Sequence, residues 1–153
     1  MIVFLDFDGV THSTPCQVDA LFGRLPLIEA VLREFETPRI VISSSWRVVH
    51  SLGALREFFS PDLAARVIGV TPVMEAERLD EHWLPNPSQH FERQWECETW
   101  MQEHRPRGTP WLAIDDRPYW FAPQCPHVLV TDPGSGFQPD DAPRLRAMIE
   151  ERL

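Results

Sequence analysis

Two pairs of aspartates are the residues of this chain best suited to chemistry. Asp6 and Asp8 flank one residue and precede Gly9, and a second pair follows at Asp115 and Asp116. In an extended segment, side chains two positions apart point the same way, so Asp6 and Asp8 can face one site. Carboxylates held this close raise one another's pKa unless a cation neutralises them. If folding unites both pairs, they predict a site for a hard cation, and Mg²⁺ is the natural candidate.

A run of hydroxyl groups is the second candidate for chemistry. Ser43, Ser44 and Ser45 come directly before Trp46 and Arg47. Serine hydroxyls at the end of a strand can donate to phosphate oxygens, as can free backbone N–H groups at a helix start. The same serines would also suit the N-cap of a helix that begins near Trp46. Arg47 either neutralises a bound anion or pairs with a surface acid.

Short apolar runs precede each of these polar groups. Predicted strands, rich in β-branched or aromatic residues, cover residues 2–5, 40–42, 111–114 and 128–130, with a weaker one at 67–70. Stretches with helical spacing lie between them. They are marked by Leu27, Val31 and Phe35, by Leu52, Leu55 and Phe59, and by residues 88–104 and 145–153. Alone, either aspartate pair would suit a turn or a helix cap, but both follow predicted strands directly.

This alternation predicts an α/β domain of the three-layer, Rossmann-like class, with a mainly parallel central sheet covered on both faces. In such sheets ligands bind at the carboxyl ends of the strands, where the aspartates and serines stand. A length of 153 residues predicts a single domain spanning residues 1–153. The six Trp and nine Phe argue against a disordered chain.

The net charge of −9, from 14 basic and 23 acidic side chains, disfavours broad binding to nucleic acid or to anionic membranes. No basic and aromatic stripe of the kind that grips single strands is evident along the chain. The apolar start of the sequence ends at Asp6, which fits neither a signal peptide nor a membrane span, so we expect a cytoplasmic protein. Three widely spaced cysteines, Cys16, Cys97 and Cys125, indicate free thiols rather than disulfides or a zinc site.

Taken together, these strings resemble the haloacid dehalogenase (HAD) superfamily over nearly the whole chain. More narrowly, LDFDGV followed by TH, then IVISSSWR, VIGVTP, and IDD followed by LVTDPGSGF, is similar to the HAD domain of Swiss-army-knife RNA-repair proteins. The resemblance implies a Mg²⁺-dependent phosphatase. Asp6 would be the nucleophile that forms an aspartyl-phosphate, and Asp8 the general acid and base. Asp6, the backbone carbonyl of Asp8, and Asp115 with Asp116 would bind the metal.

The resemblance also assigns residues to the substrate phosphate. Its second motif requires one Ser or Thr; Ser44 aligns best and Ser43 is the runner-up, because three successive serines leave the register open. Its third motif requires Lys or Arg near the start of a helix, and the chain has no lysine. Arg93 is our choice, ahead of Arg105 and Arg107, which lie past that helix.

Two features qualify the resemblance. Thr11 stands where the family commonly has leucine, which bears on substrate fit more than on activity. The first interval between the motifs is short, and the longer second one is taken up by a predicted helix, the weak strand at 67–70 and a loop near residues 83–86. We therefore expect a capless or minimally capped domain with an open site that admits large substrates. Such substrates include a nucleic-acid end or a phosphoprotein.

We therefore expect a phosphomonoesterase acting on a phosphorylated substrate, for example a nucleotide or an RNA end gripped only at its terminus. The alternative is a catalytically idle HAD-like module that binds phosphate or a partner. A dehalogenase is disfavoured because halide displacement does not need Asp8. A receiver-like signalling domain is disfavoured by motif order, since its acidic doublet would follow the first strand.

Overall fold

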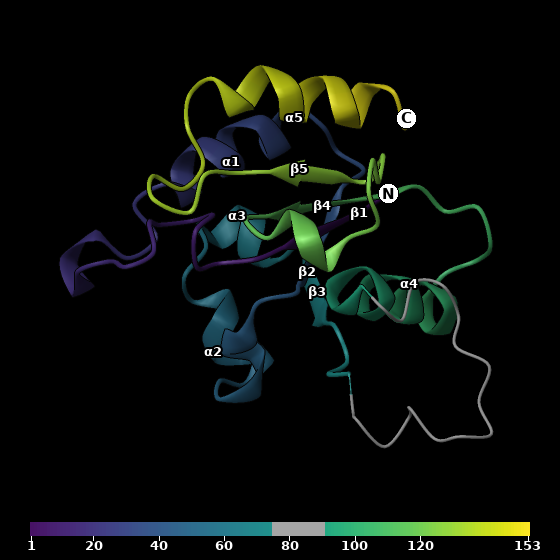
Figure 1. The fold of residues 1–153 in the computed structure, drawn as a ribbon, viewed down its shortest axis with the longest axis horizontal. Helices are drawn as coiled ribbons and strands as arrows, with labels where there is room; N and C mark the ends of the chain where they lie inside the picture. Colours follow the sequence, from purple (N-terminus) through teal and green to yellow (C-terminus); the bar gives the residue numbers. More distant parts are fainter. Residues whose placement is uncertain (75–90) are drawn as a thin grey trace.

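Five parallel strands form one sheet in the computed structural model, which describes residues 1–74 and 91–153 (Figure 1). They are β1 (Ile2–Leu5), β2 (Arg39–Ile42), β3 (Val67–Val70), β4 (Trp111–Asp115) and β5 (Val128–Val130). The order across the sheet is β3-β2-β1-β4-β5, and each neighbouring pair is parallel. All five predicted strands are present, with ends that differ by at most one residue.

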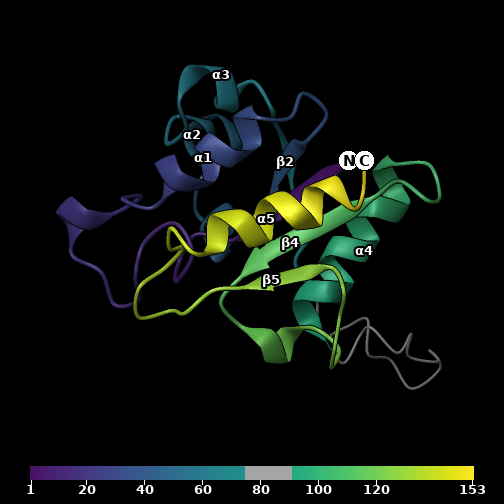
Figure 2. The same ribbon diagram turned by 90° about the horizontal axis from the view of Figure 1, so that it is seen from above.

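Helices cover both faces of the sheet, in three layers. They are α1 (Leu25–Arg33), α2 (Leu52–Arg56), α3 (Pro61–Ala64), α4 (Glu92–His104) and α5 (Asp141–Glu150), with short 3-10 helices η1 (Val18–Ala20), η2 (Ser45–Val48) and η5 (Pro118–Trp120). Figure 1 shows α1 and α5 on one side of the sheet and α4 on the other, and Figure 2 shows α5 lying over β4 and β5. The predicted three-layer, Rossmann-like α/β class is confirmed.

The two faces follow from the alternation of side chains along each strand. In β1, Val3 and Leu5 join the core under α1, α3 and α5, whereas Ile2 and Phe4 join the core under α4. All four side chains are buried, as are all five of β4. A strand buried on both faces must be apolar throughout, which is why these strands were recognisable in the sequence.

The intervals between the predicted motifs contain elements of this same domain. Between β1 and β2 lie η1 and α1; after β2 come η2, α2, α3 and β3. Within the two described ranges these intervals hold no second sheet. Residues 75–90 of the second interval lie outside the described residues, so the minimal cap stays a prediction. The predicted loop at 83–86 and the first residues of the helix predicted from 88 lie outside the described residues. Among the described helices, none is long and apolar enough to cross a membrane.

Candidate active site

The register of the central strands brings three motifs to one level. Leu5 at the end of β1 is aligned with Ile42 of β2 on one side and Ile114 of β4 on the other. The next residues, Asp6, Ser43 and Asp115, therefore leave the sheet side by side. Strand order reverses direction around β1, the position at which open α/β sheets bind ligands.

Three of the four predicted carboxylates form a compact cluster. Asp6, Asp115 and Asp116 each offer an oxygen within 4.8 Å of the others, and Asp6 and Asp115 are buried. Oδ1 of Asp116 is also buried and has no hydrogen-bond partner within the described residues. Hard oxygen ligands with one atom left unsatisfied are the donor set that suits Mg²⁺. The cluster therefore fits the predicted cation, with these three side chains as its ligands.

The electrostatics of this cluster favour a cation as well. Burial, reinforced by the charge of Asp115, raises the pKa of Asp6 well above its usual range, although Arg93 opposes the shift. Burial also raises the pKa of Asp115 to about 6, again opposed by Arg93. The pKa of the half-buried Asp116 is raised too, mainly by burial. A divalent cation would stabilise the ionised forms and relieve this repulsion.

Asp8 lies apart from the cluster and is held by its own partners. Its Oδ1 lies 2.8 Å from Nε2 of His12, and its Oδ2 accepts a hydrogen bond from Nε1 of Trp46 at 3.1 Å. The Asp8 side chain is 43% exposed, whereas that of His12 is buried. The structure thus separates the partly exposed, hydrogen-bonded carboxylate of Asp8 from a cluster of three, of which Asp6 and Asp115 are buried and Asp116 is half-buried.

The tautomer of His12 follows from its second ring nitrogen. The backbone N–H of Phe22 donates to Nδ1 of His12 at 3.2 Å, so Nδ1 carries the lone pair. The ring proton then sits on Nε2 and is donated to Asp8. Phe22 reaches this position with a φ of 59°, a left-handed conformation that is strained for a bulky residue. The fold of the loop after β1, rather than any sequence pattern, brings His12 into contact with Asp8.

Gly9 is required by the geometry of the turn after Asp8. Its φ is +76°, and a side chain there would collide with the carboxylate of Asp116. Two contacts from the segment after β5 brace the same turn. The hydroxyl of Thr131 donates to the Gly9 carbonyl at 2.8 Å, and the N–H of Phe137 donates to the Val10 carbonyl at 2.7 Å. The segment 131–137 (TDPGSGF) therefore stabilises the turn of the first motif through these two hydrogen bonds.

The serine run divides into two environments. Ser44 is the N-cap of η2, because its Oγ accepts from the N–H of Trp46 at 3.3 Å. The hydroxyl of Ser43 is buried with no partner among the described residues, and so is that of Thr71, just after β3. Ser43 and Thr71 therefore have hydroxyl groups available to a ligand, and Thr71 was not anticipated from the sequence.

Arg93, at the start of α4, is buried against the acidic cluster. Its Nε donates to Asp115 at 3.2 Å and its Nη1 to Glu96 at 2.9 Å, and its guanidinium lies 5.0 Å from the ring centre of Trp120. These two hydrogen bonds use Nε and Nη1, so of the five N–H donors of the guanidinium those on Nη2 are the ones that could face an anion. Although burial opposes its charge, the carboxylates, Asp115 above all, raise the pKa of Arg93 further.

Arg47 lies close by but is fully engaged. A guanidinium has five N–H donors, and all five of Arg47 are used. They bond the carbonyls of Ser43, Ser44, Thr71 and Pro72 and the carboxylate of Glu96. Glu96 therefore joins Arg47 to Arg93. Its place three residues after Arg93 on one helix was visible in the sequence, but the second arginine was not.

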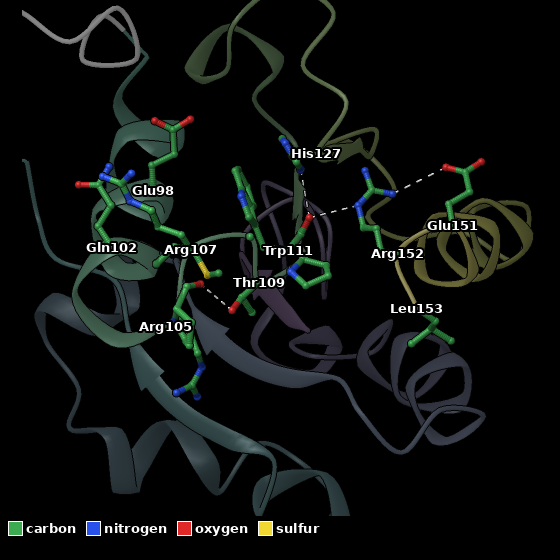
Figure 3. Close-up of a pocket in the computed structure, with 14 residues that line it drawn as sticks. Glu98, Gln102, Arg105, Arg107, Thr109, Trp111, His127, Glu151, Arg152 and Leu153 are labelled. Carbon is green, nitrogen blue, oxygen red and sulfur yellow. Dashed lines mark hydrogen bonds and ion pairs between the residues drawn. The ribbon is translucent and has the colours of Figure 1, made fainter.

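The two lower-ranked arginines lie at the other end of the sheet. Arg105 and Arg107 line a pocket of about 1030 Å³ next to the loop that leads into β4 (Figure 3). In it, His127 and Arg152 both bond the backbone carbonyl of Trp111. Because these residues precede β4 and β5 or end the chain, the pocket is remote from the carboxylates. It does not belong to the candidate active site.

The cysteines are free, as predicted. Cys97 is buried on α4, and burial raises the pKa of its thiol well above the usual value. Cys16 and Cys125 are partly buried. None of the three belongs to the acidic cluster.

A parallel α/β sheet with buried acids at the carboxyl ends of its two central strands defines the class of domain. Residues 2–142 match the family model described as the HAD domain in Swiss Army Knife RNA repair proteins, and the chain belongs to this family. HAD domains are in general hydrolases of the phosphatase type. Neither the comparison with curated proteins nor that with solved structures found a match.

Proposed function

We propose that this protein is a Mg²⁺-dependent phosphomonoesterase that acts through an aspartyl-phosphate on Asp6. The observation that supports this most directly is that the four carboxylates occupy two different environments. Asp6 clusters with the buried Asp115 and the half-buried Asp116, whereas Asp8 lies outside this cluster, with a partly exposed side chain held by two donors. A two-step displacement needs such a nucleophile next to a separate acid and base.

In the first step, an oxygen of Asp6 attacks phosphorus. The N–H of Phe7 holds Oδ1 at 2.8 Å, so we assign the attack to Oδ2. As the bond from Oδ2 to phosphorus forms, the bond from phosphorus to the leaving oxygen breaks. Asp8, protonated at this stage, gives its proton to that oxygen, and the alcohol departs.

In the second step, Asp8 takes a proton from water. The water oxygen attacks phosphorus, the bond to Oδ2 of Asp6 breaks, and inorganic phosphate is released. Asp8 is again protonated and Asp6 is again a carboxylate, so the cycle closes. Because His12 and Trp46 hold both Asp8 oxygens, the carboxyl stays in one orientation through both transfers.

Asp6, Asp115 and Asp116 would hold Mg²⁺, with the Asp8 carbonyl as a further ligand. When bound, Mg²⁺ would neutralise these carboxylates and stabilise charge on the transferring phosphoryl group. Ser43 would bind a phosphoryl oxygen through its Oγ, which has no partner among the described residues. Arg93, whose hydrogen bonds to Asp115 and Glu96 use Nε and Nη1, would bind through its remaining N–H groups. For Arg47 we propose a bracing role in place of the predicted phosphate contact, since all five of its N–H donors are used. Ser44 caps η2 by accepting from the N–H of Trp46, and its own O–H group would be a second donor to the phosphate.

For the substrate we propose a phosphate on a nucleotide or on an RNA end. The matching family is a HAD domain found in RNA-repair proteins, which supports a phosphorylated nucleotide or RNA end as the substrate. The net charge of −9 disfavours long contacts with a polyanion, so the substrate would be held at its end.

The test is a Mg²⁺-dependent hydrolysis screen over mononucleotides, 3′- and 5′-phosphorylated RNA, sugar phosphates and phosphopeptides. Asp6→Asn should lower turnover by more than about a thousandfold, because it removes the nucleophile. Asp19→Asn, on the exposed η1, is the matched control and should leave turnover unchanged. Undiminished turnover by Asp6→Asn would exclude the mechanism, and a wild type inactive on the whole panel would favour an idle phosphate-binding module.

A further inference from the structure

An exposed aromatic surface adjoins the proposed general acid. It consists of Trp46 in η2, His50 just after it, and Phe58 after α2; we refer to these three residues as the aromatic platform. Trp46 is partly exposed, His50 is exposed, and Phe58 is 36% exposed. Val48 and Val49 beside them are 65% and 77% exposed. Exposed apolar groups gathered in one place mark a contact surface.

The rings of the platform are held at fixed angles. His50 stacks on Trp46 with ring centres 5.3 Å apart and planes 23° apart, and Phe58 meets Trp46 edge-on at 5.5 Å. From the interior, Phe22 stacks on Phe58 at 4.1 Å and meets Trp46 edge-on at 5.2 Å. The side chain of Phe22, positioned by its strained backbone conformation, therefore also packs against the platform.

The platform is joined directly to the chemistry. The same Trp46 that carries His50 donates its indole N–H to Oδ2 of Asp8. In the proposed mechanism Asp8 protonates the leaving oxygen, so the alcohol part of the substrate must lie on the Asp8 side of the phosphate. The group attached to that oxygen then lies on the side of Trp46, whose Nε1 is 3.1 Å from Oδ2 of Asp8.

Local charge agrees with an anionic substrate here. The segment from Trp46 to Phe58 contains a single acid, Glu57, although the chain as a whole is strongly acidic; of its two arginines, Arg47 has a buried side chain paired with Glu96, which leaves Arg56. A nucleotide that places its base on these rings would therefore not meet a concentration of negative charge there. Aromatic side chains bind bases of any identity in this way, because every base has a π face.

We propose that the aromatic platform of Trp46, His50 and Phe58 is a nucleobase subsite, so that the substrate is a nucleotide or RNA end whose terminal base stacks there while its phosphate lies at Asp6. This inference rests on the proposed phosphatase function and names its substrate class. It was hidden in the sequence because the aromatic residues are dispersed between positions 22 and 58 and form no stripe.

The first experiment compares two substrates that differ only in the base: adenosine 5′-monophosphate and ribose 5-phosphate. The wild type should show a kcat/KM about 5-fold to 150-fold higher for the nucleotide. His50→Ala, and separately Phe58→Leu, should lower this preference at least threefold, mainly through KM for the nucleotide. Phe58→Leu keeps apolar bulk in place, so that loss of folding is not mistaken for loss of stacking.

A matched control is present elsewhere in the chain. His104 is also exposed and stacks on a tryptophan, Trp100, at 4.5 Å and 9°, but at the end of α4 that leads away from the carboxylates. His104→Ala should leave the preference for the nucleotide unchanged. A third arm compares the mononucleotide with short RNAs phosphorylated at the 5′ or the 3′ end, and so distinguishes a free nucleotide from an RNA terminus.

A binding measurement separates this inference from the proposed function. Titration of the full chain with adenosine 5′-monophosphate and with ribose 5-phosphate, followed by tryptophan fluorescence, requires no turnover. If neither is hydrolysed yet the nucleotide binds more tightly and His50→Ala weakens it, the subsite stands and the phosphatase assignment fails. If both are hydrolysed or bound equally and His50→Ala changes neither ratio, the platform is not a base subsite, and a protein partner becomes its occupant.

Discussion

Nε2 of His12 lies 2.8 Å from Oδ1 of Asp8, and the backbone N–H of Phe22 on the opposite nitrogen determines that Nε2 carries the proton. A buried ring four residues further along the chain therefore orients the partly exposed carboxyl of Asp8. The indole of Trp46 holds the second oxygen of the same carboxyl. The proposed acid and base is thus fixed by two side chains that do not themselves exchange protons with the substrate.

His12 is accordingly predicted to be a positioning residue. His12→Phe removes the hydrogen bond to Asp8, and kcat should fall about 10-fold to 100-fold with little change in KM, an effect of the size seen when supporting partners of an active-site group are lost. His12→Gln offers an amide N–H close to the position of Nε2 and should recover a substantial part of kcat. A purely structural role would make both variants equally poor, which steady-state kinetics and melting curves would reveal together.

The metal-free protein should lose stability as the pH rises. Asp115 has a pKa of about 6 when folded, and that of Asp6 is also raised, against about 4 for an unfolded aspartate. Between these values the folded state holds more protons than the unfolded state, so the free energy of unfolding falls with increasing pH. In chelator, thermal melting should therefore occur at a higher temperature at pH 5 than at pH 7.5.

Mg²⁺ and one substitution test the cause of this pH effect. Mg²⁺ should raise the melting temperature at pH 7.5, since a ligand of the native state stabilises it. Asp6→Asn removes one of the repelling charges and should shrink the difference between pH 5 and pH 7.5 without metal. If Asp6→Asn retained the full difference, the pH effect would belong to charges outside the cluster.

Gly9 is predicted to be irreplaceable because a side chain there would collide with Asp116, and Gly108 provides a control with a similar φ but no such collision. Gly9→Ala imposes a strained φ and a collision with Asp116, and we expect a loss of stability of about 1–3 kcal/mol. Mg²⁺ affinity and turnover should fall with it. Gly108 has a similar φ of +83° but no atom near its missing side chain. Gly108→Ala should cost about 1–2 kcal/mol with turnover intact.

The two adjacent serines should fail in different assays. Ser43→Ala removes the hydroxyl that has no partner among the described residues, so KM for the phosphorylated substrate should rise while the melting temperature changes little. Ser44→Ala removes the cap of η2 and should cost about 1 kcal/mol of stability. If instead Ser44→Ala raised KM and Ser43→Ala lowered stability, Ser44 would be the main phosphate-binding serine.

Outside the catalytic groups, neutralising Glu96 is predicted to cause the largest loss of folding stability. It receives hydrogen bonds from both Arg47 and Arg93 and is buried, so Glu96→Gln leaves two buried guanidinium groups short of a counter-charge. Breaking such a buried pair typically costs about 3–5 kcal/mol. Glu103→Gln, exposed on the same helix, should remain within about 0.5 kcal/mol of the wild type. Chemical denaturation of the two variants makes the comparison.

The strands were predictable because each is short, apolar and bounded by polar residues, and burial on both faces demands that composition. Asp6, Ser43 and Asp115 could be assigned to one edge on the same ground, since parallel strands end together. The choice of Arg93 over Arg105 and Arg107 depended on the family pattern, and the structure places the latter two in the remote pocket.

By itself, the sequence determined the sheet, its active edge and the acidic residues there, because local periodicity and chain order carry that information. Only the tertiary structure decided that Asp8 stands apart from the other three acids and that Arg47 is fully bonded. It alone gathered the aromatic platform. Contacts between residues far apart in the chain underlie these features: Trp46 with Asp8, Arg47 with Glu96, and Phe22 with Phe58. Strand register and packing create these contacts, and local spacing does not encode them.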